Sequence, residues 1–228
     1  QAMWQALREE GRWEGEVLNR RKNGEVFPEW ESITAVRDDS GAVRHYVAVF
    51  HELSTRQRLE LEREATTDGL TGLFNRANLE RCLEREAARS RRHGQSLSLL
   101  MVDVDHFKPV NDHHGHDVGD GVLRSLASTI AGSLRRYDCA GRWGGEEFLV
   151  LLPDTDQDEG RRVADKLRRA VSALDLQPVE GVTISIGVAC LRAGEEAAEA
   201  LQRADQALYA AKEGGRDRVL SDSEFPAN

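Results

Sequence analysis

Polar and apolar residues follow a strand-like pattern over the first fifty residues of the chain. Residues 12–18, 25–36 and 43–50 are candidate strands, and the third is rich in β-branched and aromatic side chains. Asn23-Gly24 lies between the first two, and this dipeptide is a strong hairpin signal because both residues tolerate positive φ. The pattern therefore predicts a small antiparallel sheet at the start of the chain.

Residues 54–66 have a different character and predict a connecting helix. Nearly all of them are charged or helix-forming, and Leu59 and Leu61 are the only large apolar side chains in the segment. The segment spans fewer than two heptads, so a coiled-coil dimer through this helix is an open alternative.

From residue 66 onward, helical and strand patterns alternate. The apolar run 97–104 predicts a buried strand, and a hairpin is expected at Gly144-Gly145 with residues 148–152 as its return strand. The other expected elements are helices with apolar positions at 79–87 and 118–134, a helix near 158–174, a strand over 183–189, a helix with apolar positions at 197–211 and a short edge strand over 217–220. This order predicts an α/β (α+β) fold with a mixed central sheet flanked by helices.

Composition and charge narrow the class of protein. Apolar residues make up 39% and charged residues 31% of the chain, the balance of a soluble globular protein and not of a disordered one. The 40 acidic side chains outnumber the 31 basic ones, which argues against a broad surface for nucleic acid or anionic membranes. No apolar run approaches the roughly 20 residues that span a bilayer and no signal peptide is visible, so we expect a cytoplasmic location. The first residue is Gln1 and not Met, which leads us to expect a piece of a longer protein.

The three cysteines, Cys82, Cys139 and Cys190, are far apart in the sequence and form no C-x-x-C motif. This spacing excludes a zinc ribbon and offers no disulfide framework. We expect three small core residues in a reducing environment.

Two acidic segments lie next to expected strand ends. The first is Asp103-Val104-Asp105, and since residues at i and i+2 of a strand share a face, its two carboxylates can converge. The second is Glu146-Glu147, directly after the two hairpin glycines. Taken separately, each segment also fits an ordinary strand end or hairpin with solvated carboxylates. Together they indicate a Mg²⁺ site and phosphoryl or nucleotidyl transfer, because Mg²⁺ is held by one or two carboxylates and completed by phosphates and water.

The hairpin segment resembles the motif that names the GGDEF domains, the diguanylate cyclases. Residues 144–148 have the GGEEF form of that motif. Three further blocks follow the family's order: DGLTGLFNR at 68–76, DVDHFKPVND at 103–112 with GHDVGD at 115–120, and ADQALYAAK at 204–212 followed by Gly215-Arg216. The resemblance covers the chain from residue 66 to about residue 220 and implies the nucleotidyl-cyclase-like GGDEF fold.

Such domains join two GTP molecules into cyclic di-GMP, and the resemblance implies one GTP in each protomer of a homodimer. It places Mg²⁺ on the carboxylates of Asp103 and Glu146 and on the carbonyl of Val104, with two ions in each active site and Mn²⁺ as an alternative. It also implies that Glu147 takes the proton from the 3′-hydroxyl, a task that Glu146 or a metal-bound water could perform instead.

The resemblance further implies the residues that bind GTP. Asn111 and Asp120 would read guanine, because a carboxylate accepts from both N1–H and the exocyclic amine, a pair that adenine cannot supply. Other contacts to the triphosphate and the nucleotide are implied for Lys108, Lys212, Arg216, Gly144 and Gly145.

An R-x-x-D run, Arg135 to Asp138, lies shortly before the hairpin glycines. In the family this run is the inhibitory site, where the product binds as an intercalated dimer. Relatives also supply an arginine from the following helix, where this chain has Lys166. Taken alone, an R-x-x-D run also fits a salt bridge at a helix end.

Residues 1–53 resemble the C-terminal half of a PAS sensor domain, through WEGE at 13–16, RRKNGE at 20–25 and Trp30. The expected organisation is a partial PAS sensor over 1–53, a linker helix over 54–66, a GGDEF catalytic domain over 66–220 and a tail over 221–228. The sequence thus predicts a Mg²⁺-dependent, product-inhibited diguanylate cyclase. The alternatives are a degenerate module that only binds cyclic di-GMP or GTP, and a cyclase of different base specificity.

Overall fold

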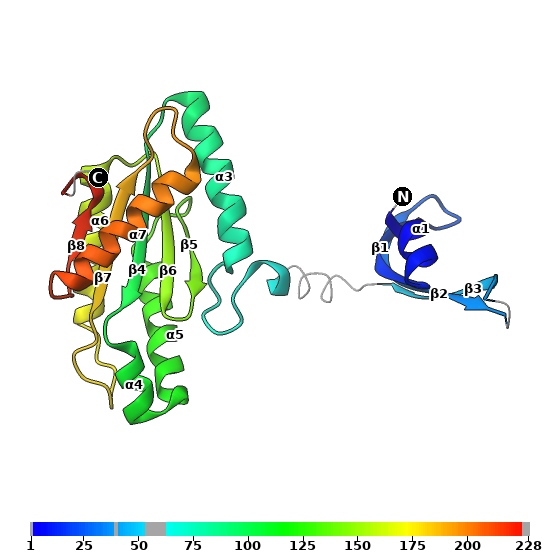
Figure 1. Cartoon of the computed structure of the whole chain (residues 1–228), viewed down its shortest axis with the longest axis horizontal. Helices are drawn as coiled ribbons and strands as arrows, with labels where there is room; N and C mark the ends of the chain where they lie inside the picture. Colours follow the sequence, from blue (N-terminus) through cyan, green and yellow to red (C-terminus); the bar gives the residue numbers. More distant parts are fainter. Residues whose placement is uncertain (1, 39–40, 53–62, 225–228) are drawn as a thin grey trace. The chain divides into compact units, whose positions relative to one another are not determined.

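The computed structural model describes residues 2–38, 41–52 and 63–224. Its contacts divide the chain into two compact units, Gln1–Arg63 and Glu64–Asn228 (Figure 1). Residues 54–62 of the expected linker helix lie outside the described residues, and residues 63–66 are helical. Among the described residues, no helix has both the length and the apolar character needed to cross a membrane.

The first unit is an antiparallel sheet with one helix packed on it. Helix α1 (Ala2–Glu9) precedes strands β1 (Arg12–Arg20), β2 (Val26–Arg37) and β3 (Val43–Glu52), which lie in the order β1-β2-β3. This confirms the expected small sheet. The sequence pattern does not predict α1, because two turns contain too few apolar positions to define a helical period. Its Leu7 is nevertheless fully buried, and α1 packs against β1 and β2.

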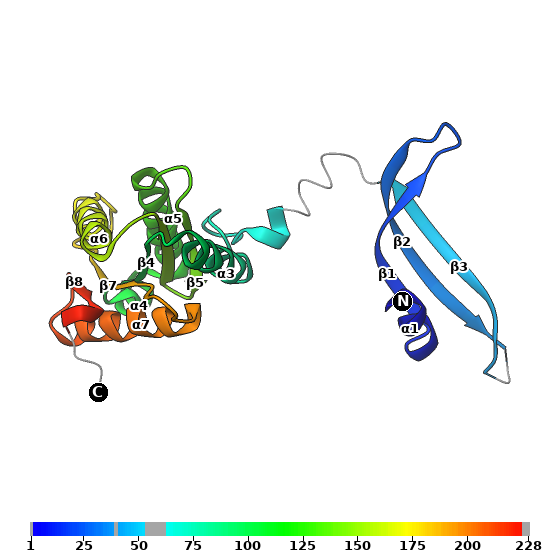
Figure 2. The same ribbon diagram turned by 90° about the horizontal axis from the view of Figure 1, so that it is seen from above.

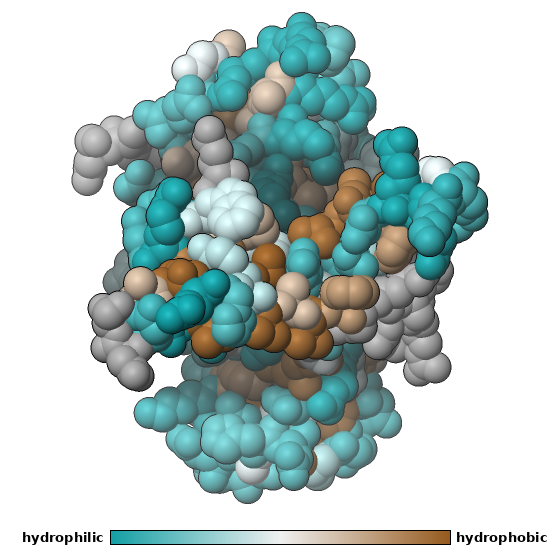
Figure 3. All heavy atoms as spheres, turned by 90° about the vertical axis from the view of Figure 1, so that its right-hand side faces the viewer, coloured by the Kyte–Doolittle hydropathy of each residue, from teal (hydrophilic) through white to brown (hydrophobic). Residues whose placement is uncertain are grey.

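Strand β3 leaves apolar side chains at the surface. Val49 and Phe50 are 65% and 64% exposed, and Tyr46 packs edge-on against Trp4 of α1 with 5.8 Å between the ring centroids. Figure 3 shows apolar surface, in brown, across this unit. The cause is geometric, since one short helix cannot cover both faces of a three-stranded sheet.

The second unit is a mixed five-stranded sheet with helices on both faces. The sheet order is β5-β6-β4-β7-β8, with all neighbours antiparallel except the parallel pair β7–β8. Its elements are α3 (Arg76–His93), β4 (Leu97–Val104), α4 (Phe107–His114), α5 (His116–Ser133), β5 (Cys139–Gly144), β6 (Glu147–Pro153), α6 (Gln157–Ser172), β7 (Ile184–Cys190), α7 (Ala197–Glu213), β8 (Val219–Ser221) and η1 (Asp222–Glu224). The expected mixed sheet flanked by helices is confirmed.

The central strand β4 is buried on both faces, which explains its unbroken apolar run. Leu100 and Val102 belong to the core formed with α5 and α6. Leu99 and Met101 point to the other face and belong to the core formed with α3 and α7. Figure 2 shows α5 and α6 on one side of the sheet and α7 on the other. Strand β4 is therefore the central, buried strand of the unit, and the candidate site lies at its C-terminal end.

Two elements of the second unit, α4 and β8, also differ from the sequence prediction. Helix α4 is not predicted, because it is only two turns long and contains Pro109, which is tolerated only near a helix start. Strand β8 begins at Val219 and not at residue 217, because Arg216 and Asp217 have left-handed backbone angles, with φ of 62° and 44°. The cysteines are free thiols as expected, two of them buried.

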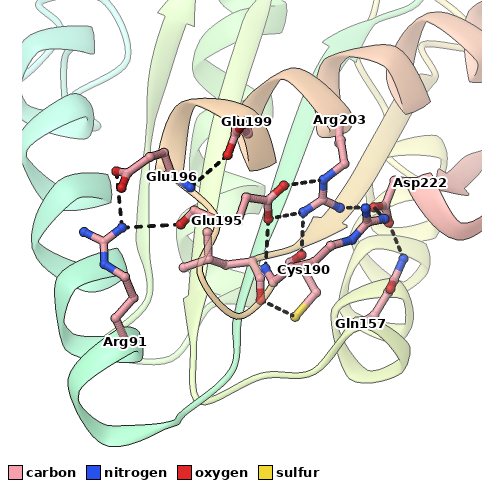
Figure 4. A network of polar contacts seen from close by, with 10 residues as sticks. Arg91, Gln157, Cys190, Glu195, Glu196, Glu199, Arg203 and Asp222 are labelled. Carbon is pink, nitrogen blue, oxygen red and sulfur yellow. Dashed lines mark hydrogen bonds and ion pairs between the residues drawn. The ribbon is translucent and has the colours of Figure 1, made fainter. Parts of the chain in front are cut away.

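A network of polar and charged side chains joins the first half of α7 to Asp222, the first residue of η1 (Figure 4). Arg203 donates from Nε and Nη2 to the two carboxylate oxygens of Glu195 at 2.7 and 2.5 Å, and from Nη2 to the Cys190 carbonyl at 2.8 Å. Its Nη1 donates to the buried carboxylate of Asp222, which also accepts from Gln157. The guanidinium and both carboxylates are therefore fully engaged by protein groups.

Candidate active site

The end of β4 brings together candidate residues from three elements. Asp103 is buried in β4, and the antiparallel register pairs it with Glu147 of β6. Lys212, in the last turn of α7, places its Nζ 2.7 Å from Asp103 Oδ2. The turn of the β5–β6 hairpin adds Glu146, whose carbonyl accepts a hydrogen bond from the backbone N–H of Val104 at 3.4 Å. The residues implied for metal binding and proton transfer thus lie at one end of the sheet.

The electrostatics of this group favour a bound cation. Burial raises the pKa of Asp103 to about 6, although a hydrogen bond from Lys212 acts to lower it. The carboxylates of Glu146 and Glu147 raise this pKa further. Lys212 pairs with Asp103, and the charges of Glu146 and Glu147 also act on Asp103, so the group has an acidic excess that a divalent cation would offset.

The donor set fits Mg²⁺ although the protein supplies few ligands. In the described part of the chain, no three His, Cys, Asp or Glu side chains are arranged to hold a metal ion. Mg²⁺ needs only one or two carboxylates when phosphates and water complete its shell. The carboxylates of Asp103 and Glu146 with the carbonyl of Val104 are such a set, all of them oxygen donors.

The position of the hairpin tip is set by an arginine. Arg142 Nε donates to the carbonyl of Gly145 at 2.8 Å, and its Nη1 lies 3.5 Å from Asp68 Oδ2. Burial acts to raise the pKa of Asp68, but hydrogen bonds from Thr71 and Arg142 outweigh it and hold that pKa below its usual value. Gly145 has a φ of 41°, a left-handed angle that glycine adopts easily. The sequence pattern gives Asp68 and Arg142 no role; the only signals are that Asp68 lies inside a family-like block and that Arg142 lies two residues before the hairpin glycines.

Asp105 supports the frame of the site through hydrogen bonds from three protein groups. Its carboxylate accepts from the hydroxyls of Thr183 and Ser185, both at 2.7 Å, and from the backbone N–H of Asp217 at 3.0 Å. These bonds tie the end of β4 to the start of β7 and to the turn that follows Arg216. The sequence placed Asp103 and Asp105 on one face, and the structure gives them separate partners.

The two guanine candidates come from the packed helices α4 and α5. Asn111 Oδ1 is buried and has no hydrogen-bond partner among the described residues. It lies against Gly119, where an added Cβ would come within 1.9 Å of the oxygen. Asp120 follows directly and is partly exposed, with Arg124 at 3.9 Å. A buried acceptor without a donor is costly in a folded protein, so this pair suits a ligand that donates N–H groups.

Two of the three triphosphate candidates lie at the C-terminal end of α7. Arg216 follows Gly215, and its backbone N–H donates to the carbonyl of Ala211 at 3.1 Å. This reversal of the chain returns the Arg216 guanidinium to within 3.5 Å of the Lys212 carbonyl. Lys108, the third candidate, is exposed on α4.

The R-x-x-D segment forms a closed turn between α5 and β5. The backbone N–H of Arg135 donates to Asp138 Oδ2 at 2.7 Å, while Asp138 Oδ1 is buried and has no partner among the described residues. Burial raises the pKa of Asp138, against the lowering effect of the Arg135 hydrogen bond. The Arg135 guanidinium donates to Glu159 of α6 at 2.8 Å, across 24 residues of sequence. The sequence pattern does not indicate Glu159, since no local pattern reveals a contact at that separation.

Comparison with known proteins agrees with this geometry. Residues 65–218 match the family model described as diguanylate cyclase, GGDEF domain, and residues 1–50 match that of the PAS fold. The chain is 41% identical over 217 residues to the diguanylate cyclase DgcP of Pseudomonas aeruginosa, which covers 93% of this chain and 30% of DgcP. It is 38% identical over 191 residues to the response regulator PleD of Caulobacter vibrioides, which covers 74% of this chain and 42% of PleD. The chain thus spans less than half the length of these curated relatives.

Solved structures show the same fold. One of them is the structure of the coiled coil and GGDEF domain of DgcB from Caulobacter crescentus in complex with c-di-GMP. It matches this chain with a TM-score of 0.69 at 37% identity, and the match covers 73% of this chain and 91% of the DgcB chain. The active GGEEF domain of a diguanylate cyclase from Vibrio cholerae gives a TM-score of 0.62 at 35% identity, covering 64% and 96% of the two chains. Both resemblances stated from the sequence are confirmed, and the chain belongs to the family of diguanylate cyclase GGDEF domains, with a PAS-fold segment before the GGDEF domain.

Proposed function

We propose that the chain condenses two GTP molecules into cyclic di-GMP and two pyrophosphates, with one GTP in each protomer of a homodimer. The observation that carries this proposal is the meeting of Asp103, Glu146 and Glu147 beside Lys212 at the end of β4. The complex of the structural relative DgcB with c-di-GMP supports the same product. Each site offers one guanine-reading pair, so the second GTP has to come from a second copy of the chain.

The carboxylates would divide the chemistry between them. Asp103 and Glu146, with the Val104 carbonyl, would hold Mg²⁺, two ions to a site, and Mn²⁺ could replace it. When bound, Mg²⁺ offsets the charge of the triphosphate and orients it. Glu147 would accept the proton of the partner GTP's 3′-hydroxyl as its oxygen bonds to the α-phosphorus. The bond to the β-phosphate oxygen then breaks, and pyrophosphate leaves with the electron pair.

The remaining residues would bind and orient GTP. Asn111 Oδ1 supplies the acceptor for a guanine N–H, and Asp120 accepts from N1–H and the exocyclic amine. Lys212, Arg216 and Lys108 offset the charge of the phosphates. Gly144 and Gly145 are both exposed at the hairpin tip, where the absence of side chains lets the nucleotide lie close to the backbone.

Two parts of the chain would regulate the activity: the R-x-x-D segment and the partial PAS sensor. Arg135 and Asp138 would bind the product and slow turnover, and the unpartnered Oδ1 of Asp138 supports such a ligand site. Residues 1–53 would form the partial PAS sensor, 54–66 the linker helix, 66–220 the catalytic domain and 221–228 a tail.

The test is product analysis after the full chain is incubated with GTP and Mg²⁺. We expect cyclic di-GMP and pyrophosphate by mass spectrometry, no product when EDTA removes the metal, and no product from ATP alone. Glu147→Gln should abolish product, while the matched control Glu84→Gln, on an exposed position of α3, should not change the rate. Binding of GTP without turnover would contradict the proposal and support a degenerate binding module.

A further inference from the structure

The two halves of the R-x-x-D segment are in different states. Asp138 presents a buried carboxylate oxygen that has no partner among the described residues. The Arg135 guanidinium, by contrast, already donates to Glu159 Oε1 at 2.8 Å. A ligand that binds the Arg135 guanidinium must therefore break the ion pair between Arg135 and Glu159. Asp138 Oδ1, by contrast, can accept a hydrogen bond from a ligand without losing a protein partner.

Glu159 is held in place by the start of α6. Asp156 is the N-cap of this helix, and its Oδ1 accepts from the backbone N–H of Glu159 at 2.8 Å. The Glu159 side chain is 34% exposed and that of Arg135 is 50% exposed, so the pair lies at the surface and a solute can reach it. The hydrogen bond from Arg135 to Glu159 also raises the pKa of Arg135, which keeps the guanidinium charged.

The neighbouring positions on α6 carry the opposite charge. Arg162 and Lys166 lie three and seven residues after Glu159, spacings that place them on the same side of the helix. Both are exposed. Glu159 is thus an acidic residue followed by two cations on the same side of α6, at the point of the helix that meets Arg135. An anionic ligand at Arg135 would meet repulsion from Glu159 and attraction from the other two.

We propose that Glu159 lowers the affinity of the R-x-x-D segment for cyclic di-GMP by pairing with Arg135. The ligand must break this ion pair, and its phosphates must approach the Glu159 carboxylate. Glu159 therefore sets the product concentration at which inhibition begins. This inference rests on the proposed inhibitory role of Arg135 and Asp138.

The test is the affinity of the full chain for cyclic di-GMP, measured by isothermal titration calorimetry. Glu159→Gln keeps the shape of the side chain and removes its charge, so we expect binding about fivefold tighter, because an exposed ion pair contributes a modest amount. Asp158→Asn is the matched control: it removes a neighbouring charge from the same first turn, has no contact with Arg135 in the described structure, and should leave the affinity unchanged. The gain in Glu159→Gln should shrink at high salt.

Variants of Arg135 separate failure of this inference from failure of the inhibitory site itself. We expect Arg135→Ala to lose product binding and the double variant Arg135→Ala/Glu159→Gln to regain none of it. If Arg135→Ala binds as tightly as the unchanged chain, the R-x-x-D segment is not the product site. If Arg135→Ala loses binding while Glu159→Gln and Asp158→Asn have the same affinity, the product site stands and the role of Glu159 is wrong.

Discussion

Helix α7 places a basic side chain among acidic ones in each of its halves, and the two groups differ in how completely they are paired. In the first half, the Arg203 guanidinium is shared between Glu195, the Cys190 carbonyl and Asp222 (Figure 4). At the far end, Lys212 contacts Asp103, whose pKa is raised by burial and by two further carboxylates. The first group is complete without a ligand, and the second has acidic charge left over.

The pKa shifts of Glu195 and Asp103 have opposite directions, in agreement with this difference. Burial acts to raise the pKa of Glu195, but hydrogen bonds from Arg203 and Arg192 outweigh it and the pKa is lowered. At Asp103 the pKa is raised, because burial and neighbouring acids outweigh Lys212. A carboxylate that the fold stabilises in its charged form is structural, whereas one whose charged form the fold disfavours suits a cation that arrives from solution. The comparison predicts that changes at the two ends have different consequences.

The largest expected effect is on activity, from Asp103→Asn. Removal of this carboxylate should lower the rate of cyclic di-GMP formation by about a thousandfold or more, since an offset of phosphate charge worth several kcal/mol is lost. The free energy of unfolding at pH 7 should not fall, because the amide has the same shape and removes a charge whose burial is unfavourable. Turnover assays and urea unfolding on the same preparation measure both quantities.

The second effect is on stability, from Arg203→Met. This change leaves Asp222 and Glu195 as charges without their main partner, so we expect the free energy of unfolding to fall by about 3 kcal/mol. The rate per folded molecule should stay near that of the unchanged chain. Arg192→Met is the comparison within the same network: its side chain also donates to Asp222, at 3.0 Å, but it is 59% exposed and should contribute less than about 1 kcal/mol. Equal losses in the two variants would show that Arg203 contributes no more to the network than the exposed Arg192.

An intermediate effect is expected from Arg142→Met, because Arg142 contacts the hairpin tip and Asp68 and is not itself among the implied metal ligands. Loss of the bonds to Gly145 and Asp68 should loosen the hairpin tip and lower turnover about 10- to 100-fold, the range for residues that orient metal ligands. The affinity for GTP should change less than the rate. A variant with unchanged turnover would show that the hairpin keeps its position without Arg142.

The smallest effects are those of pH, and they have opposite signs at the two ends. The raised pKa of Asp103 means that the folded chain binds more protons than the unfolded chain, so this group makes stability fall by about 2 kcal/mol as pH rises from about 4 to about 6. The lowered pKa of Glu195 contributes less than about 1 kcal/mol, present above pH 4.5 and lost as pH falls through the folded-state value.

Variants isolate the two contributions. Urea unfolding between pH 4 and pH 7 should show that Asp103→Asn becomes more stable relative to the unchanged chain as pH rises. Glu195→Gln should become less stable relative to the unchanged chain as pH rises through the lower part of that range. The same sign in both variants would mean that the two ends are not electrostatically different.

The sequence was sufficient for what depends on local pattern. The apolar run of β4 and the glycines of the β5–β6 hairpin predicted those elements because periodicity and turn chemistry act between neighbours in the chain. Short helices such as α1 and α4 were not predicted, since two turns do not establish a helical period. The family-like blocks indicated which residues belong to the site.

The pairings between distant residues could not be predicted in this way. Glu159 meets Arg135 across 24 residues, and Asp68 meets Arg142 across 74. Such contacts exist only once the helices and the sheet have packed. For the same reason, the spacing of Asp103 and Asp105 could not show that Asp105 accepts hydrogen bonds from Thr183, Ser185 and Asp217.

The most direct test is divalent-metal binding by the end of β4. Electron paramagnetic resonance can follow Mn²⁺ binding to the full chain in the presence of a GTP analogue that cannot be cleaved. We predict saturable Mn²⁺ binding by the unchanged chain and by Arg203→Met, and its loss in Asp103→Asn. Binding of Mn²⁺ by Asp103→Asn with the affinity of the unchanged chain would contradict a metal site at this end of the sheet.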